Sequence, residues 1–85
     1  MGQFGRLNES ARYLGESLAR DPRSAETHDS LGVTLARMGR VDDAVGHFRK
    51  ALEIDGSFEP ARTHLRIVES AIQSGRGLSD LSRER

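Results

Sequence analysis

Apolar residues recur along the middle of this chain at the spacing of amphipathic helices. One stripe consists of positions three or four residues apart: His28, Leu31, Leu35 and Met38. A second stripe follows it: Val41, Ala44, Val45, Phe48 and Leu52. Such intervals place side chains on one face of a helix, whereas strands alternate at every second residue. The pattern therefore predicts two helices that meet at Gly39-Arg40 and form a tight hairpin, with Asp42 and Asp43 at the positive start of the second helix.

Helical spacing and turn residues continue over most of the chain. They predict four helices, over residues 7–20, 24–38, 42–54 and 58–74. Asp21-Pro22 and Asp55-Gly56 end two helical runs, because proline and glycine interrupt helices. Gly5-Arg6 and Gly75-Arg76 repeat the Gly39-Arg40 dipeptide and are predicted to be turns. Residues 77–85 are predicted to be a polar, frayed C-terminal tail.

Identical residue types return at a fixed interval. Each of four pairs is separated by 34 positions: Gly5 and Gly39, Arg6 and Arg40, Leu18 and Leu52, Asp21 and Asp55. Leu31 and Leu65 are related in the same way. A period of this length indicates stacked supersecondary units that bury a common core.

Residues 25–58 resemble a tetratricopeptide repeat, a helix-turn-helix unit with this period and a characteristic pattern of small and large residues. The pattern stands here as His28-x2-Leu31-Gly32-x2-Leu35, then Ala44-x3-Phe48 and Ala51. Leu35 replaces the usual tyrosine and Gly56 the usual proline. Gly32 and Ala44 are expected to let two helices approach closely. The resemblance implies an all-α fold, a right-handed α-solenoid of antiparallel helical hairpins with about four helices.

The resemblance also divides the chain. We expect a repeat domain over residues 1–76, made of a half repeat (1–24), a full repeat (25–58) and a capping helix (59–74), before the tail. In the capping helix Arg66 and Glu69 stand at normally small or apolar positions. Its register has two candidate spacings, 34 residues or 36, the latter aligning Thr63-His64 with Thr27-His28.

Composition and charge narrow the functional classes. The chain has 85 residues, no cysteine and 13 basic against 13 acidic residues, hence a formal net charge of zero. Such a balance disfavours nucleic acid and anionic lipid as partners. No run of more than two apolar residues occurs, so neither a membrane-spanning helix nor a signal peptide is predicted, and a cytoplasmic location is expected.

No catalytic or metal-binding motif is present in the sequence. His28, His47 and His64 lack a metal-ligand spacing, and Asp42 and Asp43 point in different directions on a helix. Gly75-Arg76-Gly77 is too short for a phosphate-binding loop. We therefore expect no enzyme activity, no cofactor and no metal.

The expected activity is the binding of a peptide or protein segment in a concave groove. By resemblance, the first helices of the units line this groove with eight residues: Glu26, Asp29, Val33, Ala36, Arg37, Thr63, Ile67 and Ser70. The lysine and asparagine clamp of chaperone-binding family members is absent, since Asp29 and Val33 occupy the matching places. Val33 and Ile67 would form an apolar floor, and Asp29 would pair with a basic residue of the partner.

Two alternatives remain open at this stage. The chain could be an assembly scaffold that forms homo-oligomers through exposed repeat ends, with Phe4, Leu7 and Leu14 as the self-association surface. It could also be a fragment of a longer repeat protein.

Overall fold

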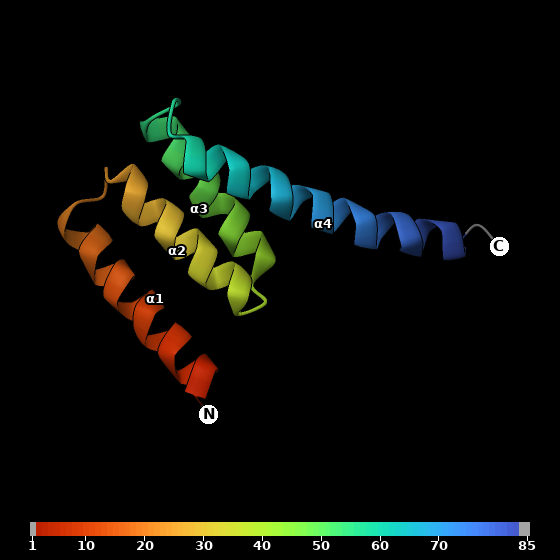
Figure 1. Ribbon diagram of the computed structural model, residues 1–85, viewed down its shortest axis with the longest axis horizontal. Coiled ribbons are helices and arrows are strands. Elements are labelled where there is room, and N and C mark those ends of the chain that lie inside the picture. Colours follow the sequence, from red (N-terminus) through yellow and green to blue (C-terminus); the bar gives the residue numbers. More distant parts are fainter. Residues whose placement is uncertain (1, 84–85) are drawn as a thin grey trace.

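The computed structural model describes the backbone of residues 2–83 and the side chains of residues 5–73. Within that range every regular element is an α-helix: α1 (Gly2–Arg20), α2 (Ala25–Arg37), α3 (Val41–Ile54) and α4 (Glu59–Arg83). Successive helices run antiparallel and lie side by side (Figure 1). The expected all-α fold of helical hairpins is confirmed.

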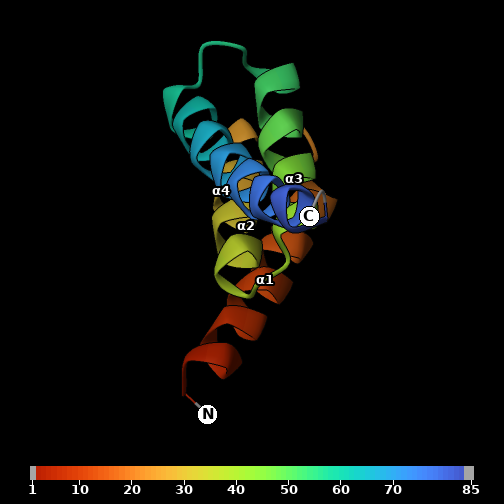
Figure 2. The ribbon, with the colours of Figure 1, turned by 90° about the vertical axis from the view of Figure 1, so that its right-hand side faces the viewer.

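The helices stack in the order of the sequence. α1 packs on α2, α2 on α3 and α3 on α4, and α2 also contacts α4. The molecule is thin, with extents of 51 × 36 × 16 Å. The C-terminal half of α4 projects beyond the other helices, and the N-terminal turns of α1 extend past α2 (Figures 1 and 2). Contacts between neighbours in the stack are the defining property of helical repeats.

The turn between α2 and α3 depends on Gly39. Its φ of 86° is a left-handed conformation, which residues with a Cβ atom rarely adopt. The Arg40 amide donates to the Leu35 carbonyl at 2.9 Å, and the Gly39 amide donates to the Ala36 carbonyl at 3.1 Å. This pair of hydrogen bonds is a Schellman motif, which satisfies the last carbonyls of α2 and turns the chain toward α3.

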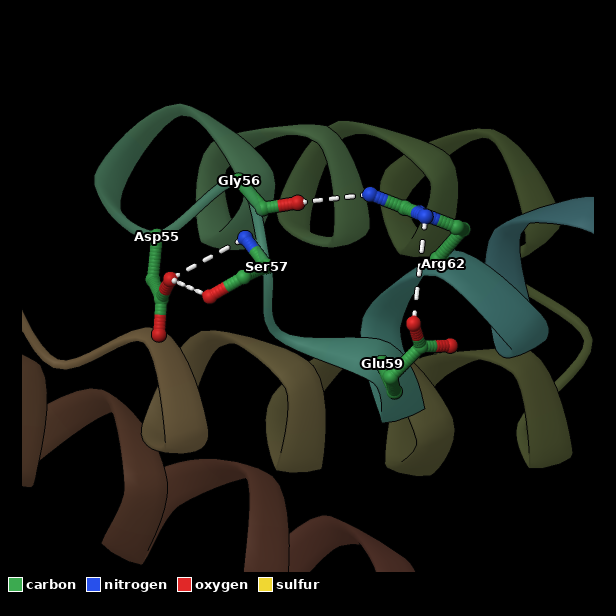
Figure 3. Close-up of polar contacts among 5 residues, drawn as sticks. All are labelled: Asp55, Gly56, Ser57, Glu59 and Arg62. Atoms are coloured by element: carbon green, nitrogen blue, oxygen red, sulfur yellow. Dashed lines mark hydrogen bonds and ion pairs between the residues drawn. The ribbon is translucent and has the colours of Figure 1, made fainter.

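The α1–α2 and α3–α4 loops have a similar pattern of hydrogen bonds. Asp21 accepts a hydrogen bond from the Arg23 amide at 3.3 Å, and Asp55 accepts one from the Ser57 amide at 3.1 Å and one from the Ser57 hydroxyl at 2.8 Å. These are aspartate turns, in which a carboxylate replaces a backbone acceptor. Figure 3 shows the second loop.

A side chain from the following helix also closes each loop. His28 Nε2 donates to the Pro22 carbonyl at 3.2 Å, and Arg62 Nη2 donates to the Gly56 carbonyl at 2.8 Å (Figure 3). Donors and acceptors in the two loops are 34 residues apart, as are the starts of α2 and α4. The structure therefore supports the 34-residue register for α4 rather than the 36-residue one.

The core lies between α2 and α3. Its buried residues are Leu31, Leu35, Ala44 and Phe48, and partly buried side chains from α1, α2 and α4 pack against them. Phe48 is 1% exposed. A Cβ atom built on Gly32 would lie 2.6 Å from Phe48 Cε1. Gly32 thus makes room for an aromatic ring, a more specific role than the close helix approach expected from the sequence.

Two predicted helix ends were wrong. Gly5 and Arg6 lie inside α1, and α4 continues through Gly75 and Gly77 to Arg83 instead of ending near Ser74. A glycine costs a helix only about 1 kcal/mol and does not stop it as proline does. Residues 77–83 are therefore helical in the structure and not the frayed tail predicted for 77–85.

The surface expected for self-association is only partly exposed. Leu14 packs against the core cluster together with Ala11 and Leu18. Leu7 is half-buried. The side chain of Phe4 lies outside the described residues. The α1 surface therefore offers less uncovered apolar area than the sequence indicated.

Candidate peptide-binding groove

An open cavity of about 240 Å³ lies where α2 contacts α4. The residues that line it come from both helices and from the core beneath: Val33, Ala36, Arg37, Phe48, His64, Ile67 and Val68. Four of them were predicted groove residues, namely Val33, Ala36, Arg37 and Ile67. The structure brings these four together as the repeat register implied, and we call this cavity the α2–α4 groove.

Three lining residues were missed from the sequence. Phe48 was assigned to the helix seam, where its ring is indeed buried, but the same ring also borders the groove. His64 and Val68 lie three residues before and one after Ile67. Positions i, i+3 and i+4 share one helix face, so helical spacing alone could have added both residues to the groove.

Asp29 does not have the role expected of it. It is 7% exposed, and His64 Nδ1 donates a hydrogen bond to its Oδ1 at 2.9 Å. An ionised carboxylate can only accept, so the Nδ1 atom of His64 carries the proton. Asp29 therefore positions the His64 ring beside Phe48, with ring centroids 5.5 Å apart, instead of presenting a negative charge to a partner.

The other predicted groove residues lie elsewhere. Ser70 lines a different and larger cavity of about 750 Å³ between α3 and α4, together with Val45, Leu65, Arg66 and Ile72. Glu26 and Thr63 are exposed and line neither cavity. The α2–α4 groove is thus lined by only four of the eight predicted groove residues.

A histidine pair lies beside a third cavity of about 610 Å³ near α1 and α3. His28 Nδ1 and His47 Nδ1 are 3.1 Å apart, and their rings stack with centroids 5.3 Å apart. Burial lowers the pKa of His47 below 6.5, the positive charge that His28 can carry lowers it further, and Asp43 opposes this shift. Among the described residues no three His, Cys, Asp or Glu side chains are grouped as metal ligands would be.

None of the helices in residues 2–83 combines the length and the apolar character that a bilayer crossing requires.

Comparison with known proteins agrees with this geometry. Residues 25–58 match the tetratricopeptide repeat family. A relative described as a BBSome complex member BBS4 homolog, from Drosophila melanogaster, is 44% identical over 43 residues, which are 51% of this chain. The chain covers 9% of that relative's length. No solved structure matches the chain significantly. Residues 25–58, with Gly32 against Phe48 and a 34-residue interval between the starts of α2 and α4, are therefore similar to a tetratricopeptide repeat in both sequence and helix arrangement.

Proposed function

We propose that this chain is a non-enzymatic protein-interaction module that binds a peptide or protein segment in the α2–α4 groove. Tetratricopeptide repeats are in general interaction modules, and residues 25–58 form one. The relative from Drosophila is described as a member of a protein complex, which supports a role in a protein assembly. The division into a half repeat (1–24), a full repeat (25–58) and a capping helix (59–74) is part of this proposal.

The observation that carries the proposal is the exposure of Ile67 at an apolar cavity. Ile67 is 60% exposed, and Val33, Phe48 and Val68 lie around the same space. Burying a large aliphatic side chain is worth about 1.5–3 kcal/mol relative to leaving it in water. A ligand side chain that covers Ile67 and fills the cavity would recover part of this free energy.

The test begins with selection of binding peptides from a random library displayed on phage. Amide chemical shifts of the labelled chain are then recorded with a selected peptide. We expect the largest shift changes in residues 33–37 and 64–68, because these segments line the groove. Failure to select any peptide, or shifts confined to α1, would contradict the proposed function.

Two matched variants distinguish peptide binding in the groove from nonspecific binding to exposed hydrophobic residues. Ile67 and Tyr13 are the large hydrophobic residues that stand most exposed among the described side chains, at 60% and 68%. Ile67→Ser should weaken binding of a selected peptide about tenfold, since it removes most of an apolar contact. Tyr13→Ser changes an equally exposed residue on α1, away from the groove, and should leave binding unchanged. Equal effects of the two variants would contradict the groove as the binding site.

A further inference from the structure

We propose that the segment bound in the α2–α4 groove carries an aliphatic side chain next to an acidic residue, with the acidic side chain pairing with Arg37. This inference rests on the proposed function of the groove and adds the chemistry of its partner. It reverses the expectation from the sequence, in which Asp29 was to attract a basic residue.

The size and lining of the cavity select a single apolar side chain. Five of the seven lining residues are apolar, and the cavity volume of about 240 Å³ is below the 300–1,000 Å³ typical of sites for drug-sized ligands. The space between Val33, Phe48 and Ile67 therefore suits one aliphatic side chain of a longer segment.

The charge at the cavity comes from Arg37. None of the seven lining residues is acidic, and the nearest buried carboxylate, Asp29, already accepts a hydrogen bond from His64. Arg37 is exposed at the end of α2. The field at this edge of the groove therefore attracts an anionic side chain and repels a cationic one.

Arg37 is available for this role because no described side chain neutralises its charge. Arg40 pairs with Asp43 at 2.8 Å, and Arg49 pairs with Glu69 at 3.0 Å. Arg62 contacts the Gly56 carbonyl and Glu59. Among the described side chains, by contrast, none forms an ion pair with Arg37.

Arg37 also has a purely structural explanation, which the test must separate from binding. A cation in the last turn of a helix interacts favourably with the negative end of the helix dipole. That role would affect the stability of α2 but would not distinguish between peptides of opposite charge. Peptide preference is therefore the informative measurement.

The probes are three short, fluorescently labelled peptides of otherwise identical sequence. The first has a central leucine flanked by glutamates, the second replaces the glutamates with lysines, and the third replaces the leucine with glycine. Fluorescence anisotropy should show the first peptide binding roughly three- to tenfold more tightly than the second, as expected for an exposed ion pair. The preference should shrink in high salt, and the glycine peptide should bind weakly.

The Arg37→Glu variant should invert the preference, so that the lysine peptide binds more tightly than the glutamate peptide. Arg12→Glu changes an exposed arginine on α1 and should keep the original preference. Equal binding of the two charged peptides, no binding of either, or an unchanged preference in Arg37→Glu would overturn the inference. The proposed function would survive those results if library-selected peptides still bound at Ile67, and it would fail separately if none did.

Discussion

Gly32 and Phe48 define the contact between the two helices of the central repeat. The Phe48 ring is buried against the α-carbon of Gly32, and a methyl group there would lie within 2.9 Å of three ring atoms, Cε1, Cδ1 and Cζ. Contacts below 3.0 Å force some atom to move. Because Phe48 is 1% exposed and packs within the core cluster, the ring cannot rotate away at low cost.

The first prediction compares two glycines that lie within helices. Gly32→Ala should destabilise the chain by up to about 2 kcal/mol, because overpacking costs about 1–3 kcal/mol and the better helix propensity of alanine returns about 1 kcal/mol. Gly46→Ala should stabilise the chain by up to about 1 kcal/mol, since a Cβ on Gly46 meets no atom within 4 Å. Urea denaturation midpoints measure both effects. Stabilisation by both substitutions would show that Gly32 is not required by the Phe48 ring.

The contact between His28 and His47 depends on which of their ring nitrogens carry protons. The Pro22 carbonyl can only accept, so His28 Nε2 carries a proton. In neutral His28 the Nδ1 lone pair then accepts a hydrogen bond from His47 Nδ1 at 3.1 Å. Both Nδ1 atoms cannot carry a proton in this geometry, so simultaneous protonation of the two rings would break the contact.

The second prediction concerns pH. Burial, and then repulsion from His28, lowers the pKa of His47 in the folded chain below 6.5, so the unfolded chain binds a proton more readily. The corresponding stability is fully present above pH 6.5 and is lost as the pH falls through the folded pKa. The free energy of unfolding should therefore be highest above pH 6.5 and decrease as the pH falls below it. In His47→Gln, which keeps a donor but does not titrate, this decrease should be smaller. An NMR titration midpoint for His47 at or above 6.5 would contradict the prediction.

At the scale of the elements, the repeat unit is defined by its connections as much as by its helices. The aspartate turns at Asp21 and Asp55 position α2 and α4 in the same way on the preceding helices. A donor from the next helix, His28 or Arg62, closes each loop although the two side chains differ chemically. The shared requirement is a hydrogen bond to the carbonyl of the second loop residue.

Helix positions and the repeat interval could be predicted from the sequence because both depend on local spacing. Helix ends could not be predicted equally well. The Gly-Arg dipeptide is a turn at Gly39, where the chain adopts a positive φ, but part of a helix at Gly5. The dipeptide alone does not distinguish the two, since glycine permits both conformations.

Only some features of the groove could be predicted from the sequence, because the others depend on contacts between distant parts of the chain. The repeat register grouped Val33, Ala36, Arg37 and Ile67, and all four line one cavity, since their relative positions follow from helical periodicity. The role of Asp29 depends on His64, which is 35 residues away and reaches it only because α2 and α4 pack together. Such a pairing is a tertiary contact, and no local pattern encodes it.

At the scale of the whole molecule, all four helices share one core. Leu14 and Leu18 from α1 and Leu65 and Val68 from α4 pack against the same α2–α3 cluster that contains Phe48. At roughly 0.05–0.15 kcal/mol per residue, a chain of 85 residues has a stability of about 4–13 kcal/mol. Loss of this cluster would therefore affect the outer helices as well as the central repeat.

The third prediction tests this dependence with Phe48→Ala. Deletion of a buried phenylalanine side chain costs about 3–5 kcal/mol, a large part of the total stability. Amide hydrogen exchange in α1 and in the first half of α4 should accelerate together with exchange in α2 and α3, and helical circular dichroism should decrease in one transition at lower urea concentration. Ile67→Ala removes an exposed side chain and should change stability by less than about 0.5 kcal/mol while weakening peptide binding. Retained protection of α1 and α4 in Phe48→Ala would mean that these helices are stabilised independently of the central core, and the chain would then be a set of separable units.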